Sequence, residues 1–175
     1  MYIGHVGAAL AAKRFRASIG LFALLVATYV PDWVDGGLCL AGVHNPEGML
    51  SHSIPAVLLF ALAGFSLYAI RTRDRTGALI VAGLIVSHML LDWITGYKPT
   101  WPGGPMIGLR VYGHPIVDFI VEGVLIVAGA VLYGRTLPPR SRPWVDVAIM
   151  LGALLVLQLG IDVAHIMMRS LPKCG

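Results

Sequence analysis

Charged residues are scarce in this 175-residue chain: Asp, Glu, Lys and Arg make up 13% of it, against about 25% in soluble domains. Cysteine is sparse too, since the two cysteines fit no metal-binding motif and are too few for a disulfide framework. This composition excludes a disordered chain, a nucleic-acid-binding tail, an ordinary cytosolic enzyme and a large extramembrane domain. The chain is instead 57% hydrophobic with a mean hydropathy of +0.79, which indicates an integral membrane protein.

Five apolar runs are long enough, or nearly long enough, to cross a bilayer as helices. They cover residues 17–31, 54–70, 78–97, 115–134 and 144–168. The segments between them are rich in proline, glycine and arginine, which end helices. The sequence therefore predicts an all-α polytopic membrane helix bundle with about five transmembrane helices. Residues 1–175 form one integral membrane domain whose main partner is the lipid bilayer.

The basic residues are distributed unequally between the predicted loops. Nine of the 13 fall in residues 13–16, 71–75 and 135–142, which lie on one side if the chain has five spans. Under the positive-inside rule this side is cytoplasmic. We therefore expect a multi-pass protein of the bacterial inner (plasma) membrane, with cytoplasmic loops near 13–16, 71–77 and 135–143. Residues 32–53 and 98–114 then lie outside with the C-terminus, and the sequence leaves open whether Cys39 and Cys174 pair.

Residues 1–12 are apolar and rich in glycine and alanine, but too short to cross the membrane. They could form an amphipathic surface helix. They could also form a re-entrant half-helix that turns at 13–16 and packs against the first span, since small residues permit close helix packing. We favour the half-helix for a reason that depends on His5, given below.

Ionisable side chains within predicted spans are informative because each costs about 2.5–3.5 kcal/mol to insert. In Ser87-His-Met-Leu-Leu-Asp92, His88 and Asp92 stand four residues apart and share one helix face. An imidazole and a carboxylate at this spacing can bind one metal ion. The alternative is a hydrogen bond between them that joins helices.

Two further patterns precede or follow a span. In Ser51-His52-Ser53 the hydroxyls could fix the histidine tautomer, although serine followed by Pro55 also suits a helix N-terminus. In Pro31-Asp-Trp-Val-Asp35 two carboxylates, Asp32 and Asp35, suit a hard or borderline cation. The alternative for this second pattern is a polar helix end beside an interfacial tryptophan.

Depth along the spans relates some of these residues to one another. Glu122 lies seven residues inside the fourth span, about 10 Å deep, and His88 lies at a similar depth in the third. Asp92 is one turn shallower, and His52 enters from the same side. We therefore expect His52, His88, Asp92 and Glu122 to meet in one outward-opening pocket. Asp118 either shares this face or reaches the interface, and His114 is either a gate or a surface residue.

Four short motifs of the sequence resemble those of a known family. Gly4-His-Val-Gly7, Pro31-Asp32, Ser51-His-Ser53 and Ser87-His-x-Leu-Leu-Asp92 occur in that order. This resembles the superfamily of membrane-bound metal-dependent hydrolases that includes the LexA-regulated inner-membrane proteins. Gly4–Arg14 is also similar to the start of a set of bacterial membrane proteins that carry a Pro-Gly-Gly-Pro loop and a glutamate-bearing helix. The resemblance covers residues 1–134, and the last span, 144–168, is generic.

The resemblance implies a divalent metal, zinc above all, held by histidine and aspartate side chains. Carried over position by position, the ligands are His5, Asp32, His52, His88 and Asp92, with Glu122 as a base or further ligand. A straight helix from residue 2 to residue 31 would hold His5 about 40 Å from Asp32. His5 can therefore be a ligand only if the chain reverses direction, which favours the re-entrant half-helix.

These features support one main functional hypothesis: hydrolysis of an ester or phosphoester, in a lipid-like substrate, at the non-cytoplasmic face. Zinc would lower the pKa of a bound water. Glu122 and Asp92 would be catalytic, and the supporting positions are Ser51, Ser53, Asp35, His114 and Asp118. The alternative is a non-catalytic subunit or scaffold of a larger membrane complex, in which the same residues join helices or hold a structural metal. A metal or proton transporter is a third hypothesis, but the sequence has no internal repeat of the usual kind.

Overall fold

The computed structural model describes residues 2–138 and 143–167. The long helices are α2 (Leu21–Leu40), α4 (Ile54–Thr72), α5 (Arg75–Thr95), α6 (Pro115–Gly134) and α7 (Pro143–Met167), preceded by the short α1 (Gly4–Ala12). The smaller elements are η1 (Pro46–Gly48), α3 (Met49–His52), β1 (Lys98–Pro99), β2 (Met106–Ile107) and η2 (Val111–Gly113). Cys174 lies outside the described residues, and so does the question of its pairing with Cys39.

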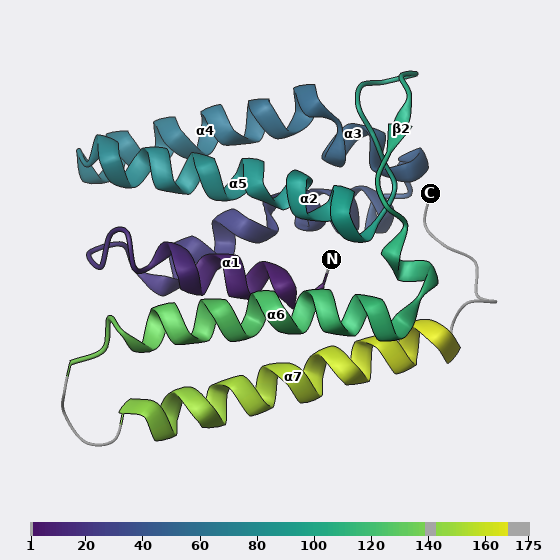
Figure 1. The fold of residues 1–175 in the computed structure, drawn as a ribbon. Coiled ribbons are helices and arrows are strands. Elements are labelled where there is room, and N and C mark those ends of the chain that lie inside the picture. The colour runs from purple at the N-terminus through teal and green to yellow at the C-terminus, as the bar shows by residue number, and fades with distance from the viewer. Residues whose placement is uncertain (1, 139–142, 168–175) are drawn as a thin grey trace.

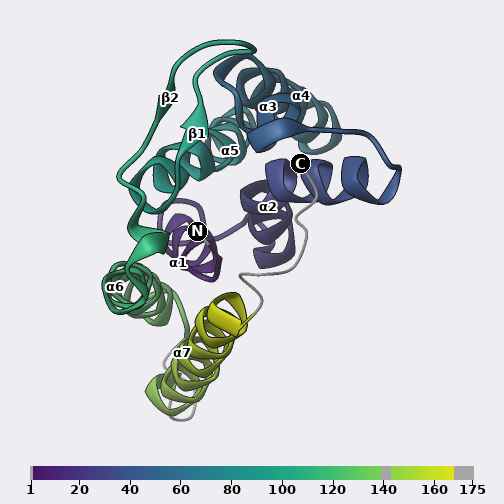
Figure 2. The same cartoon turned by 90° about the vertical axis from the view of Figure 1, so that its right-hand side faces the viewer.

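The predicted class is confirmed: in the described part of the chain, five helical segments are long and apolar enough to span a membrane. α4, α5, α6 and α7 run alongside one another (Figure 1), whereas the second half of α2 turns away from their direction (Figure 2). Viewed from one end, α1 occupies the middle, with α6 and α7 on one side and α2, α5 and α4 on the other (Figure 2). α4 packs on α5, α5 on α2, α1 on α6, and α6 on α7. Many apolar side chains on the outer faces of these helices are exposed, as expected for contact with lipid.

The N-terminal half-helix is present and folds back against the first span. α1 ends at Ala12, and the chain reverses before α2 begins at Leu21. The Tyr29 hydroxyl donates to the Tyr2 carbonyl at 2.8 Å, which places the start of α1 beside the middle of α2. The reversal therefore carries the first residues of the chain into the centre of the bundle (Figure 2).

α1 can occupy this central position because two glycines let it approach α6 closely. A Cβ atom built on Gly129 would lie 2.1 Å from the Gly7 carbonyl oxygen, and one built on Gly7 would lie 2.4 Å from that of Leu125. Any larger side chain would force the two backbones apart. Small residues thus set the depth at which α1 packs.

The first span differs from its predicted bounds of 17–31. α2 begins at Leu21 and continues through Pro31 to Leu40, so Asp32 and Asp35 lie within a helix rather than in a loop. Proline lacks an N–H and disrupts the helix around it, but such breaks are tolerated in membrane helices where neighbouring groups satisfy the freed backbone atoms. Pro31 therefore interrupts the helix without ending it.

Two of the segments predicted to be cytoplasmic lie together at one end of the bundle. Arg16, before α2, donates from Nε to Asp74 Oδ2 at 3.0 Å, and Asp74 belongs to the turn between α4 and α5. Asp74 Oδ1 also accepts from the Gly77 N–H at 3.0 Å and so begins α5. The orientation of this end in the membrane stays a prediction.

Candidate metal centre

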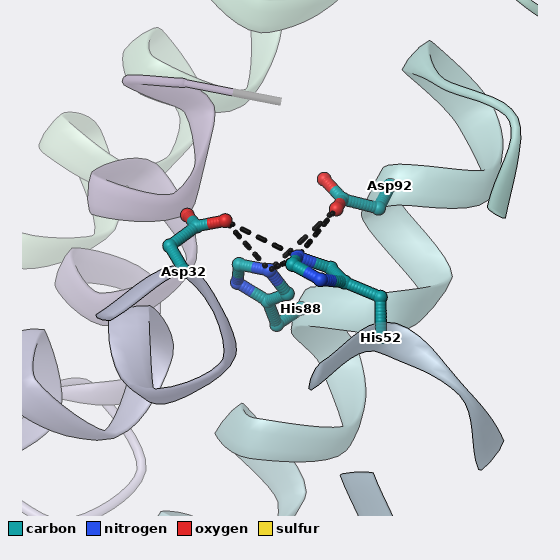
Figure 3. A group of neighbouring side chains, drawn as sticks. All are labelled: Asp32, His52, His88 and Asp92. Carbon is teal, nitrogen blue, oxygen red and sulfur yellow. Dashed lines mark hydrogen bonds and ion pairs between the residues drawn. The ribbon is translucent and has the colours of Figure 1, made fainter. Parts of the chain in front are cut away.

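Four of the predicted ligands converge at the opposite end of α5. Asp32 comes from α2, His52 from α3, and His88 and Asp92 from α5. One ligand atom from each residue lies within 4.8 Å of all the others. The four side chains point toward one another (Figure 3). We call these four residues the metal centre.

His88 is fixed in one tautomer by a backbone carbonyl. Its Nδ1 lies 2.6 Å from the Thr28 carbonyl oxygen, which can only accept, so Nδ1 carries the hydrogen. A neutral His88 therefore has its lone pair on Nε2, which faces the other three residues. This Nε2 lies 3.5 Å from Asp32 Oδ1 and 3.6 Å from Asp92 Oδ2. The Thr28 carbonyl lies three residues before Pro31, where the helix is interrupted.

His52 is oriented in the same way through a hydroxyl. Its Nδ1 lies 2.8 Å from Ser51 Oγ, and Ser51 Oγ lies 3.2 Å from Asp35 Oδ1 and 3.3 Å from the Gly48 carbonyl. Asp35 Oδ1 and the Gly48 carbonyl oxygen can only accept, so the serine hydroxyl donates to them and accepts from the His52 ring. His52 Nε2 therefore faces Asp32 Oδ1 at 3.2 Å and Asp92 Oδ2 at 3.4 Å.

The turn that presents His52 requires glycine. Gly48 adopts φ +77°, a conformation that side chains rarely tolerate, and a Cβ there would lie 2.9 Å from His52 Nδ1. Asn45 completes the turn by donating from Nδ2 to Ser51 Oγ at 3.1 Å and to Asp35. His52 is thus held by the loop that joins α2 to α3 as well as by its own helix.

The facing Nε2 atoms of the two imidazoles need a cation between or beside them. The Nε2 atoms of His52 and His88 are 3.3 Å apart, and in the neutral tautomers both carry lone pairs. Two lone pairs at this separation repel unless a proton or a metal ion lies between or beside them. Two imidazole nitrogens and two carboxylate oxygens form a donor set that suits zinc, and the two carboxylates balance its charge.

The metal centre is buried except at Asp32. His52, His88 and Asp92 are buried, whereas the side chain of Asp32 is 37% exposed. A ligand would therefore approach past Asp32.

His5 lies beside this group but outside it. Its Nε2 lies 3.3 Å from Asp92 Oδ1, the oxygen turned away from His52 and His88, and its ring stacks on that of His88 with centroids 3.9 Å apart. His5 is fully buried, and its Nδ1 has no hydrogen-bond partner among the described residues. These contacts place His5 where it orients Asp92.

Glu122 is buried in α6 and holds the start of α1. Its carboxylate accepts from the Tyr2 N–H at 2.9 and 3.0 Å and from the Gly4 N–H at 2.9 Å. Nearby, Gln158 of α7 accepts from the Ile3 N–H at 3.1 Å and donates to Asp162 at 2.8 Å. We call Glu122, Gln158 and Asp162 the anchor cluster, because their hydrogen bonds tie α6 and α7 to the beginning of α1.

The remaining predicted positions are more dispersed. Ser53 is buried directly before α4, and His114 is exposed directly before α6. Asp118 is buried one turn before Glu122, and its Oδ1 has no hydrogen-bond partner among the described residues. None of these three belongs to the group of four that could hold an ion within the described chain.

Sequence reasoning missed three contributors to the site. The Thr28 carbonyl and the Asn45 amide orient the ligands, and neither leaves a recognisable pattern in the sequence. Lys98 has its Nζ 3.8 Å from Asp92 Oδ2. A lysine directly after the span that carries His88 and Asp92 was a signal for this last contact.

Comparison with known families matches residues 1–166 to the family described as YdjM inner membrane protein. The match includes the last span as well as the segment whose motifs carry the resemblance. No curated protein and no solved structure matches the chain.

Proposed function

The chain belongs to the YdjM inner membrane protein family, and we propose that this multi-pass inner membrane protein is a metal-dependent hydrolase. Its substrate is an ester or phosphoester of a lipid-like molecule, reached from the non-cytoplasmic face. The observation that carries the proposal is the pair of Nε2 atoms 3.3 Å apart, each set facing inward by a hydrogen bond behind its ring.

This arrangement is typical of a metal site rather than of hydrogen bonds that only join helices. Metal-binding histidines usually donate their other ring N–H to a carbonyl, a carboxylate or a hydroxyl, as His88 and His52 do here. Residues that merely join helices would instead place a donor opposite each acceptor. Asp32, His52, His88 and Asp92 would hold the ion, with zinc the best match to the donor set.

A bound divalent ion would supply a Lewis acid that activates water and polarises the ester. Hydrolysis adds water across the ester bond: the water oxygen joins the acyl carbon or phosphorus, and the alcohol leaves with a proton. Asp32 would hold the ion through Oδ1, and its other oxygen would accept a proton from incoming water, since this carboxylate is the partly exposed one of the centre. His5 would keep Asp92 oriented through their 3.3 Å contact.

Of the two residues predicted as catalytic, Asp92 belongs to the centre and Glu122 to the anchor cluster. The Glu122 carboxylate already accepts three contacts from backbone N–H groups. We therefore assign Glu122 a positioning role: it fixes Gly4, the residue before His5.

The metal content of the detergent-purified protein tests the proposal directly. We expect about one divalent ion per chain in the wild type and loss of it in His88→Ala and Asp92→Ala. His44→Ala is the matched control, since His44 is exposed and outside the centre. A metal-free wild type, or metal retained by both variants, would contradict the proposal.

Enzyme activity separates this function from that of a non-catalytic subunit or scaffold. The metal-loaded protein is to be screened against carboxyl esters and phosphoesters, both as soluble compounds and in vesicles. A hydrolase turns over at least one class and loses that activity in His88→Ala. Bound metal with no turnover of any class would instead favour a structural metal in a membrane subunit.

A further inference from the structure

A pocket of about 620 Å³ opens beside the metal centre. Its lining includes Asp35, Glu47, Tyr97, Lys98, Arg110 and Tyr112. Lys98 joins the pocket to the centre, because its Nζ lies 3.8 Å from Asp92 Oδ2. The pocket has a size typical of a small-molecule site and adjoins the group that would carry out the chemistry.

Lys98 would lose its counter-charge if the centre held a metal ion. Its side chain is 21% exposed, and Asp92 is the carboxylate within ion-pair distance of its ammonium. A divalent ion bound by Asp92 would take up that negative charge and add a positive one next to Lys98. An anionic ligand placed between them would relieve this repulsion.

Arg110 provides a second cation at the same pocket, held by its backbone and by an aromatic ring. It has φ 56°, unusual for a residue other than glycine, and its N–H donates to the Gly96 carbonyl at 3.0 Å. Its guanidinium lies 3.8 Å above the centre of the Tyr97 ring. No carboxylate of the described residues forms an ion pair with it. These contacts hold Arg110 in place at the rim of the pocket.

The carboxylates in the lining form no ion pair with Lys98 or Arg110 among the described residues. Asp35 instead accepts hydrogen bonds from Asn45 and Ser51, which hold His52. Glu47 is an exposed residue of the η1 turn. Arg110 therefore remains to bind a ligand, and Lys98 joins it once a metal takes up the charge of Asp92.

We infer that this pocket binds the phosphate of a phosphoester, with Lys98 and Arg110 as its ligands. Arginine matches two phosphate oxygens with its planar fork, and lysine supplies a point charge. This inference rests on the proposed function. It places the phosphate of the substrate beside the metal centre and selects phosphoesters over carboxyl esters. The binding itself can be measured without any turnover.

Binding of inorganic phosphate to the metal-loaded, detergent-purified protein is the first test. We expect Lys98→Met and Arg110→Met each to raise the Kd at least tenfold, with metal content unchanged. Lys98→Arg should restore most of the affinity, because it keeps the charge. Arg135→Met is the matched control, since Arg135 is an exposed cation after α6, outside the pocket lining. An unchanged Kd in both methionine variants overturns the inference.

Competition then identifies the source of the phosphate. One arm adds vesicles of phosphatidic acid in phosphatidylcholine, and the other adds soluble glycerol phosphate. Displacement of inorganic phosphate in a Lys98-dependent manner by either compound supports the site, and the more effective one names the source. Displacement by neither means an adventitious ion only and overturns the inference.

Failure of this inference can be told apart from failure of the proposed function. If His88→Ala loses metal and turnover while the wild type hydrolyses carboxyl esters without binding phosphate, the hydrolase stands and the phosphate pocket does not. If the wild type holds no metal but binds phosphate through Lys98 and Arg110, the pocket stands and the hydrolase does not.

Discussion

The metal centre and the anchor cluster are two buried polar groups on either side of α1. They differ in the directions in which their hydrogen-bond donors and acceptors point. In the anchor cluster, Glu122 and Gln158 direct their oxygens at backbone N–H groups, so donors meet acceptors. In the metal centre, the Nδ1–H groups of His52 and His88 point away from the centre, and the Nε2 atoms that point into it are both acceptors. A buried ionisable residue in a membrane protein is thus informative through the direction of its lone pairs, more than through its presence.

α1 connects these two groups through adjacent residues. Gly4 is bound by Glu122, and the next residue, His5, contacts Asp92. The two groups should therefore respond differently to mutation: changes in the centre affect metal binding, and changes in the anchor cluster affect stability first.

The largest expected effect is that of His52→Ala on metal affinity. We expect a fall of more than about 100-fold, because loss of a ligand should exceed the 10–100-fold cost of losing a partner behind a ligand. Titration against a competing chelator measures it. Gln158→Ala is the comparison from the anchor cluster and should leave metal affinity nearly unchanged; equal losses in the two variants would remove the distinction between the groups.

Glu122→Gln should act mainly on stability. An amide nitrogen in place of one carboxylate oxygen would face backbone N–H groups, and the charge-assisted bonds would be lost. We expect a loss of about 1.5–3 kcal/mol. Thermal unfolding in detergent measures it, with metal affinity determined in parallel. If affinity falls as far as in His52→Ala, Glu122 belongs with the metal centre.

Ser51→Ala tests the support behind His52. The ring would lose the acceptor that holds its Nδ1–H, so we expect metal affinity to fall about tenfold or somewhat more. Ser87→Ala is a close control: that hydroxyl donates to the Leu84 carbonyl of its own helix, next to His88. The same chelator titration should show little change for the control. An effect as large in Ser87→Ala would mean that the assay reports general loosening of the bundle.

The smallest effect is expected at the opposite end of the bundle. The Gly77 N–H lowers the pKa of Asp74, assisted by Arg16. Because the folded pKa is depressed, this contribution is complete above the unfolded value of about 4 and is lost as the pH falls below it. Asp74→Asn should therefore reduce the thermal midpoint slightly at pH 6 and by less at pH 3. A decrease of the same size at both pH values would show that the carboxylate charge is not its cause.

The sequence predicted the helices well because their signal is length and hydropathy, which are local properties. It also found Asp32, His52, His88 and Asp92, the four residues that converge. The predicted bounds of the first span were wrong because the apolar run stops before Asp32, whereas α2 continues through Pro31 to Leu40, since membrane helices tolerate proline.

Depth matching also grouped Glu122 with His88, but the structure places them in different groups. Depth along a helix is a single coordinate and does not fix the direction in which a side chain points around the axis. Glu122 points at the start of α1, and His88 points at His52. Angular position depends on which helices are neighbours, and one sequence does not provide that information.

The contacts of α1 with α6 also impose an order on biosynthesis. Gly4 and Glu122 are 118 residues apart, so the ribosome needs about 6–24 s to make the second after the first. Residues 32–92, which carry the four residues of the metal centre, are complete before α6 exists. The nascent chain can therefore bring these four residues together early, and α1 can already pack against α2 and α5. Insertion of α6 then completes the packing of α1, because it supplies Glu122 and Gly129.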